Sequence, residues 1–493
     1  MPIRVKEPLW LGVDVGTQAA RALVVNDEGK VFGAGSAALA STRRGPWHEQ
    51  DPRQWWIAVV AATRAALTGI PADAVAALAV DATSGTVLLV DGDGHPRTEA
   101  LMYDDTRAAS QARVVDEVGA PLWHALGYGR MQPSWALPKL LWLLKRHPEL
   151  ASETIRLCHQ ADLINSNFIG HPVATDTSNA LKSGYDLIEN RWPSDVFNRL
   201  GVPFEVLPKV VRPGTHLGGV GVRASKLTGI PMGTPVVAGM TDGCAAQLGA
   251  GCVEIGSWNS VLGTTLVLKG VSGHLVHDPE GALYCHRGPG NTWLPGGASS
   301  SGAGVIAEWF GAADLDGLTT AAAELPIGPL AYPLIPRGER FPFRAPNAET
   351  FMLGHADTDA GVFAALLLGV ACLERLCFDR VAMLGAPTEG PLTFTGGATR
   401  NGYWTQLRAD MLGRTVWLPH QPEPALGMAI LASTSSGKSL ADASASIVRG
   451  GRELVPNPAR AAVLRQRYTD FVEALSARGW LDPAIAQYVH TRP

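Results

Sequence analysis

Two carboxylates stand where proton transfer and metal binding could use them. Asp14 follows the apolar run 9–13 and precedes a glycine-threonine turn, and Asp242 follows a second apolar run, 236–241. Open α/β sheets bind their ligands at the carboxyl ends of strands, where we expect both residues. Asp242 could take a proton from a substrate hydroxyl as a general base, and Asp14 could hold a hydrated Mg²⁺. The alternatives are that Asp14 caps its own turn and that Asp242 is a helix N-cap.

The turn that follows Asp14 has a counterpart in the second half of the chain. Segments 11–17 and 260–265 each consist of a β-rich run and a Gly-Thr turn, and a second apolar run follows each of them. Glycine permits a close approach to an anion, and exposed N–H groups and threonine hydroxyls form a cradle for phosphate oxygens. The cradle residues are Gly16 and Thr17 in the first turn and Gly263, Thr264 and Thr265 in the second. Two cradles predict a duplicated nucleotide-binding fold with its ligand between the halves.

A third glycine turn, 396–401, joins an apolar strand to a helix. Its backbone N–H groups could face a phosphate or an adenosine, although a plain glycine turn is the alternative. Two other motifs are weaker. Segment 435–439 looks like the end of a Walker A loop, but position 432 is Ala where glycine is required, so we expect a surface loop. Segment 302–307 fits a relaxed dinucleotide pattern without an acidic ribose partner, so NAD is not predicted.

Alternating strands and helices are expected to position these residues. Strand patterns cover 9–13, 21–26, 31–37, 75–81, 87–91, 256–269 and 392–395. Helix patterns cover 52–68, with Asp51 as the N-cap, and 136–145, 161–168, 302–310, 360–379 and 458–478. The alternation predicts α/β layers, and no low-complexity linker divides them.

Length and composition narrow the class of protein. A chain of 493 residues is too long for one ordinary core, so we expect two large domains. Lys+Arg 41 against Asp+Glu 45 gives a net charge of −4 without long blocks of either sign, which argues against nucleic-acid and membrane-surface partners. The longest strongly apolar run, about 363–373, is too short to span a bilayer. The six scattered cysteines are typical of reduced, buried side chains, and we expect a cytoplasmic location.

Nine segments, in order along nearly the whole chain, resemble the FGGY family of carbohydrate kinases. They are 11–21, 81–89, 103–107, 139–142, 160–162, 239–243, 262–266, 338–340 and 395–401. The resemblance implies an α/β fold of two actin-like (ribonuclease H-like) domains with the active site in the cleft between them. It places a sugar-binding domain at 1–248, a nucleotide-binding domain at 249–433 and a helical tail at 434–493 that packs on both.

The family also implies a chemistry, which is the phosphorylation of a terminal hydroxyl of a small-molecule sugar by ATP with Mg²⁺. By this resemblance Asp242 is the catalytic base, Asp14 is the acidic residue of the first phosphate loop, and both hold the metal through water. The nucleotide contacts it implies are Gly16, Thr17 and Gln18 at the γ-phosphate, Gly263, Thr264 and Thr265 at the β/γ region, and Gly302, Gly396, Gly397 and Asn401 along the adenosine. A homodimer is left open, since dimers are common in the family.

Four segments look most like the D-ribulose kinases within this family: 81–89, 179–185, 293–299 and 337–342. By that match the sugar pocket is lined by Asp14, Thr17, Ser84 and Asp242, and the product is D-ribulose 5-phosphate. The tail after Ser433 departs from the shortest ribulose kinases, so a pentulose is better supported than ribulose. The alternatives are a kinase for D-xylulose or another sugar or polyol, and a non-catalytic actin-like sugar- or nucleotide-binding protein.

Overall fold

The computed structural model describes residues 7–491, with the backbone alone at 151 and 152. The chain forms two compact units, and neither is continuous in sequence. The first contains the residues up to Val253 together with His286–Leu294 and Gln421–Arg449. The second contains Glu254–Cys285, Pro295–His420 and the residues from Gly450 onward. These units follow spatial proximity, and the linear boundaries at 248 and 433 stay a prediction.

A six-stranded sheet forms the centre of the first unit, in the order β12-β13-β6-β1-β2-β3. Its strands are β1 (Leu9–Val15), β2 (Ala19–Asn26), β3 (Val31–Ala38), β6 (Val75–Ala82), β12 (His216–Gly219) and β13 (Pro235–Val237). β1 and β13 both pair in parallel with β6, so the carboxyl ends of these three strands meet at one edge. The predicted strands at 9–13, 21–26, 31–37 and 75–81 are confirmed.

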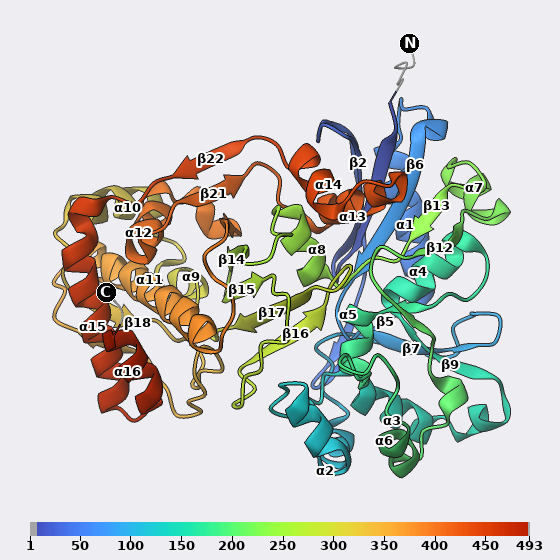
Figure 1. Cartoon of the computed structure of the whole chain (residues 1–493), viewed down its shortest axis with the longest axis horizontal. Helices are drawn as coiled ribbons and strands as arrows, with labels where there is room; N and C mark the ends of the chain where they lie inside the picture. Colours follow the sequence, from blue (N-terminus) through green and yellow to red (C-terminus); the bar gives the residue numbers. More distant parts are fainter. Residues whose placement is uncertain (1–6, 492–493) are drawn as a thin grey trace. The chain divides into compact units, whose positions relative to one another are not determined.

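Helices cover both faces of this sheet. α1 (Pro52–Ala66), with Asp51 as its predicted N-cap, shares a buried cluster with Leu11 and Val13. Side chains alternate between the two faces of a strand, so Gly12 points the opposite way. There α13 (Pro424–Ser433) packs so closely that a Cβ on Gly12 would lie 1.7 Å from the Ala425 carbonyl oxygen. Figure 1 shows α13 across the blue strands of the sheet.

The remaining elements of the first unit build a smaller sheet and its surroundings. This five-stranded sheet has the order β4-β5-β8-β7-β9, with β4 (Thr42–Arg44), β5 (Trp47–Gln50), β7 (Val87–Asp91), β8 (Ala100–Leu101) and β9 (Ile155–His159). A two-stranded pair joins β10 (Thr175–Asp176) to β11 (Val210–Val211). The helices are α2 (Ala109–Ala125), α3 (Ala136–Arg146), α4 (Gln160–Ile169), α5 (Thr177–Ala180), α6 (Ser194–Leu200), α7 (Val222–Thr228), α8 (Asp242–Gly249) and α14 (Leu440–Ile447).

The second unit is built on a seven-stranded sheet in the order β16-β17-β15-β14-β20-β21-β22. Residues 286–294, which end β16 and begin β17, are grouped with the first unit. Its strands are β14 (Trp258–Leu262), β15 (Leu266–Gly270), β16 (Leu283–Arg287), β17 (Trp293–Ala298), β20 (Leu392–Thr395), β21 (Val416–Pro419) and β22 (Gly451–Leu454), and a separate pair is β18 (Leu330–Tyr332) with β19 (Phe351–Leu353). The helices are α9 (Gly304–Phe310), α10 (Leu315–Glu324), α11 (Asp359–Met383), α12 (Gly402–Leu412), α15 (Ala461–Ala477) and α16 (Pro483–Thr491). β14 runs antiparallel to β15 and parallel to β20, which repeats the pattern around β1.

Helix α11 is the central helix of the second unit. By length and composition it could cross a membrane, but 78% of its most apolar window is buried inside the protein. It contacts α10, α12 and α15 as well as β18. The wholly buried Arg408 of α12 donates from Nε to Glu374 of α11 at 2.6 Å. These contacts are the pattern of a core helix.

Candidate functional site

Three aspartates meet at the carboxyl edge of the six-stranded sheet. Asp14 on β1 lies in register with Asp81 on the neighbouring β6. Ala82 then forms a parallel bridge with Thr241, so that Asp242 begins α8 one residue beyond the same edge. Asp14 is 3% exposed and Asp81 is 0% exposed. The sheet topology therefore brings together the two carboxylates predicted from the sequence and adds a third.

Asp81 is the most unusual of the three electrostatically. Neither of its carboxyl oxygens accepts a hydrogen bond from the described residues. Burial raises the pKa of Asp81 well above its ordinary value of 3.8, and the negative charges of Asp14 and Asp242 raise it further. Burial also raises the pKa of Glu423, again with a contribution from Asp14. Among the described residues, this edge of the sheet therefore brings together more carboxylates than cations.

The nearby cation is Arg21, whose Nη1 donates to Oδ2 of Asp14 at 2.9 Å. Its side chain is 49% exposed, so water screens much of its charge. Carboxylate oxygens in excess of cations are the donor set that a hydrated Mg²⁺ takes. The unpartnered oxygens of Asp81 and the nearby Asp14 therefore fit a divalent cation.

The loop between β6 and β7 carries Ser84, and two lysines hold its backbone through hydrogen bonds. The buried Lys139 donates from Nζ to the Gly85 carbonyl oxygen at 3.0 Å, and Lys182 donates to the Ser84 carbonyl oxygen at 3.0 Å. The Ser84 hydroxyl is buried and has no hydrogen-bond partner within the described part of the chain. A buried hydroxyl without a partner is costly unless a ligand engages it. Ser84 is thus suited to a hydroxylated substrate.

The turn between β1 and β2 has the form of an anion cradle. Gly16 N donates to the Ala19 carbonyl oxygen at 3.1 Å and closes the turn. Within residues 7–491, the amides of Thr17 and Gln18 donate to no backbone or side-chain acceptor. Gln50, a buried residue at the end of β5, stabilises the turn, because its Nε2 donates to the Thr17 carbonyl oxygen at 2.7 Å. Two free amides on a fixed turn are the groups that bind phosphate oxygens.

Tyr103 brings an aromatic side chain to the same region. Burial raises the pKa of the Tyr103 phenol, and Asp104 and Asp242 add to the shift, so this phenol lies near the predicted base. Its side chain is nevertheless 40% exposed. Asp105 in the same segment accepts hydrogen bonds from His48 N at 2.7 Å and from Arg107 Nη2 at 2.7 Å. The segment is therefore anchored, with Tyr103 at its exposed end.

The second unit repeats the cradle between β14 and β15. Gly263 N donates to the Thr265 carbonyl oxygen at 3.2 Å, and within the described chain the amides of Thr264 and Thr265 have no acceptor. A neighbouring turn secures the cradle, because Ala303 N donates to Gly263 O at 2.9 Å and Gly304 N donates to Thr264 O at 3.0 Å. The turn that contains Gly302 thus contacts the cradle directly.

A cavity of about 510 Å³ opens beside this second cradle. Gly263 and Thr264 line one part of it, and Gly397 and Asn401 line another. Asn401 is fixed there, because its Nδ2 donates to Thr319 Oγ1 at 2.8 Å and its side chain caps α12. Phe363, Trp404 and Leu315 add apolar surface. A concave cavity with apolar walls and a few fixed polar groups suits a nucleotide.

Gly396 allows the third glycine turn, 396–401, to pack closely beside this cavity. Its φ of +92° lies in the region that glycine alone adopts readily, and a Cβ there would meet the Leu262 carbonyl oxygen at 2.5 Å. Leu262 ends β14, immediately before Gly263. The absence of a side chain therefore lets the ends of β14 and β20 lie against each other.

The predicted site residues separate into two groups. Those in the first unit are Asp14, Gly16, Thr17, Gln18, Ser84 and Asp242, and those in the second are Gly263, Thr264, Thr265, Gly302, Gly396, Gly397 and Asn401. Their individual roles stay predictions. Sequence reasoning missed Asp81, although its place at the end of an apolar run was the same signal that selected Asp14. It also missed Gln50, which has no such signal because its partner Thr17 is distant in sequence.

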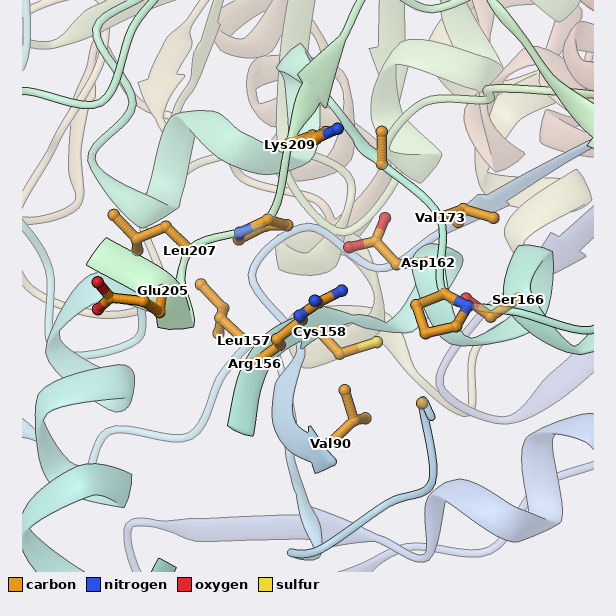
Figure 2. A pocket seen from close by; sticks show the side chains of 14 residues that line it. Val90, Arg156, Leu157, Cys158, Asp162, Ser166, Val173, Glu205, Leu207 and Lys209 are labelled. Carbon is orange, nitrogen blue, oxygen red and sulfur yellow. The ribbon is translucent and has the colours of Figure 1, made fainter. Parts of the chain in front are cut away.

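A further cavity of the first unit contains none of these residues. It measures about 320 Å³ and lies between β9 and segment 205–209. Figure 2 shows Arg156, Asp162 and Lys209 around it. Asp162 also accepts from His159 Nδ1 at 2.8 Å, and the other ring nitrogen of His159 lies 2.7 Å from Ser183 Oγ. Asp162 lines the cavity, but Ser183 and His159 are 0% exposed, so no substrate can reach this hydroxyl and the Ser-His-Asp chain serves structure.

The chain matches known proteins over most of its length. Residues 9–249 match the N-terminal domain, and residues 256–436 the C-terminal domain, of the FGGY family of carbohydrate kinases. A protein named xylulose kinase from Streptomyces rubiginosus is 31% identical over 435 residues, which cover 86% of this chain and 88% of that protein. A protein named autoinducer-2 kinase from Salmonella choleraesuis (strain SC-B67) is 28% identical over 491 residues, with 92% of each chain covered. The crystal structure of xylulose kinase from Rhodospirillum rubrum has a TM-score of 0.83 at 24% identity and covers 98% of this chain and 100% of that one.

Proposed function

Because the chain belongs to the FGGY family of carbohydrate kinases and is a phosphotransferase of that two-domain fold, we propose that it phosphorylates a terminal hydroxyl of a pentulose with ATP. The substrate we put first is D-ribulose, which gives D-ribulose 5-phosphate. The observation that carries the proposal is the position of Asp242, at the same sheet edge as Asp14 and Asp81. A sugar hydroxyl at this edge would meet a carboxylate able to accept its proton.

The proposed reaction divides its tasks between the two units. In the first unit, Asp242 takes the proton of the sugar hydroxyl while that oxygen attacks the γ-phosphorus and ADP leaves. In the second unit, the amides of Thr264 and Thr265 and the cavity at Asn401 bind the nucleotide. Mg²⁺, when bound, would neutralise phosphate charge, and Asp14 and Asp242 would hold it through water. Phosphoryl transfer needs alignment and charge neutralisation more than covalent help, which suits this set of groups.

The sugar is the finer part of the proposal. Ser84 favours D-ribulose, because it belongs to a segment that resembles ribulose kinases. Tyr103 stands where Trp is typical and argues against a standard xylulose kinase, and both residues lie in the first unit with Asp242. The second candidate is D-xylulose, which is favoured by the names of several relatives that match most of the chain. A site that hydrogen-bonds a substrate hydroxyl discriminates strongly against a sugar that lacks this contact. A substrate panel therefore separates the two candidates.

The test is ADP release from ATP and Mg²⁺ with D-ribulose, D-xylulose, L-ribulose, ribitol and glycerol. We expect turnover to be highest with D-ribulose, and we expect Asp242→Asn to lower kcat by about 10²–10⁴-fold, as loss of a general base does. The matched control is Asp195→Asn, an exposed aspartate on α6. Highest turnover on D-xylulose would keep the kinase and replace the sugar. Full activity in Asp242→Asn would refute the base, and no sugar-dependent turnover despite ATP binding would favour the non-catalytic alternative.

A further inference from the structure

Two arginines of the first unit flank one threonine, Thr177, at the start of α5. Arg212 directly follows β11, where Val211 pairs with Asp176, the residue before Thr177. Thr177 Oγ1 in turn donates to the backbone carbonyl oxygen of Arg287 at 3.0 Å. A strand pair and a hydrogen bond therefore bring together two arginines that are far apart in sequence.

Neither arginine forms an ion pair with a carboxylate within the described residues. Arg212 donates from Nη2 to the neutral Asn190 Oδ1 at 2.8 Å. Arg287 makes a long contact from Nη1 to the Asn291 carbonyl oxygen, 3.4 Å, and its guanidinium lies 4.2 Å from the centre of the Trp293 ring. Arg212 Nη1 and Arg287 Nε are both buried and have no acceptor in the described part of the structure.

The charges of these two side chains are not compensated. Burial lowers the pKa of Arg212 and of Arg287, and the positive charge of Arg212 lowers the pKa of Arg287 further. The group that raises the pKa of Arg212 is the phenol of Tyr185, which is neutral at neutral pH. Like charges close together with unsatisfied donors are unfavourable unless an anion joins them. Guanidinium groups match carboxylate and phosphate oxygens in both charge and geometry.

We propose that Arg212 and Arg287 form a binding site for a small oxyanion, either a carboxylate or a phosphate group. The site goes beyond the proposed function, because a neutral pentulose carries no such group. It adjoins the predicted base, since Ser178, the second residue of α5, accepts a hydrogen bond from Thr241 N at 2.9 Å, directly before Asp242.

Two sources could supply this oxyanion. One is the carboxylate of a sugar acid that occupies the sugar site. The other is phosphate, either free or as the ester of a phosphorylated sugar. The first source would compete with D-ribulose for the protein. Free phosphate in its own site would leave D-ribulose binding unchanged.

The test is calorimetric titration of the full chain with inorganic phosphate and, separately, with D-ribonate, each with and without D-ribulose. We expect saturable binding of at least one anion, weakened about tenfold or more by Arg287→Met and by Arg212→Met, because each removes charge-assisted hydrogen bonds. The control variant is Arg223→Met, an exposed arginine on α7, which should bind like the wild type. Binding of ADP and thermal unfolding check that each variant is folded.

Each outcome decides the proposal. Binding of D-ribonate that D-ribulose abolishes supports the site and assigns it to a sugar acid, whereas binding of phosphate that D-ribulose leaves unchanged supports the site and assigns it to phosphate. Absence of saturable binding of both anions to the wild-type protein overturns the proposal, and this result does not depend on the folding of any variant. Equal binding in the wild type and both methionine variants overturns it as well. Neither titration depends on kinase activity, so the test of this site remains valid even if the proposed function is refuted.

Discussion

Asp14 and Asp81 have identical side chains whose carboxylates have different hydrogen-bonding partners. They lie in register on neighbouring parallel strands, and both are nearly or wholly buried. Asp14 has a guanidinium partner in Arg21 at 2.9 Å, whereas the Asp81 oxygens accept no hydrogen bond from the described residues. Burial therefore favours the neutral form of Asp81. A neutral Asp81 keeps the charge at this edge below that of three carboxylates.

This difference predicts a pH dependence of stability. The folded state keeps the Asp81 proton at pH values where the unfolded chain, with a pKa near 3.8, has released it. The folded protein binds more protons in that window, so the stability contributed by Asp81 is present at lower pH and is lost as pH rises. In Asp81→Asn this pH-dependent loss of stability is absent, because the amide does not ionise. We expect the variant to unfold at a higher temperature than the wild type near neutral pH, with a gap that narrows as pH falls.

Thermal unfolding measured across pH in metal-free buffer, with Asp195→Asn as the exposed control, tests this expectation. Metal-free buffer is needed because a bound cation would stabilise the ionised carboxylates. Parallel curves for the wild type and Asp81→Asn would show that Asp81 ionises normally in the fold.

At the scale of elements, each cradle turn depends on a buried polar residue outside it. Gln50 holds the first turn, as described above, and Glu339 supports the second. The Glu339 carboxylate accepts from Ser299 Oγ at 2.9 Å, Ser300 N at 2.6 Å and Tyr332 Oη at 2.8 Å. The segment it fixes continues to Ser301, whose carbonyl oxygen accepts from Leu266 N at 2.8 Å, where β15 begins. Glu339 thus acts as a positioning residue for the β14–β15 turn.

We predict that Glu339→Gln lowers the stability of the protein by about 1.5–3 kcal/mol, because an amide nitrogen cannot accept the hydrogen bonds that one carboxylate oxygen now receives. The displaced turn should raise the KM for ATP more than the KM for the sugar. Urea unfolding and steady-state kinetics measure the two effects. Tyr332→Phe is the milder comparison, since it removes one donor and should cost about 1 kcal/mol. An equal rise of the KM values for ATP and for the sugar would argue against a role of Glu339 confined to the β14–β15 turn.

At the scale of the whole molecule, the chain leaves and re-enters each unit. Residues 421–449, which follow the second unit's segment 295–420 in sequence, belong to the first unit, where α13 packs against β1. Residues from 450 onward return to the second unit and add β22 to the edge of its sheet. The predicted sugar residues nevertheless lie in the first unit, whereas the residues predicted at the β/γ-phosphates and along the adenosine lie in the second. The residues predicted at the γ-phosphate, Gly16, Thr17 and Gln18, belong to the first unit.

This separation predicts that ligand effects can be changed independently. A ligand that binds only the folded state raises the unfolding temperature. Ser84→Ala should reduce the stabilisation by D-ribulose while the stabilisation by ADP persists, and Asn401→Ala should do the reverse. Thermal shift measurements with each ligand alone test both variants, and each variant is the control of the other. Loss of both ligand effects in Ser84→Ala would mean that the two sites are not independent.

The sequence by itself determined the features that depend on near neighbours. The Gly-Thr turns, the N-cap Asp51, the strand that carries Asp14 and the strand that precedes Asp242 follow from backbone preferences and from alternating or apolar patterns over a few residues. Motif order along the chain was also readable, and with it the family. The register of Asp14 with Asp81, the supports from Gln50 and Glu339 and the meeting of Arg212 with Arg287 were decided by the tertiary structure alone. Each of these joins groups that are distant in sequence, and only strand pairing and packing set which distant side chains share one environment.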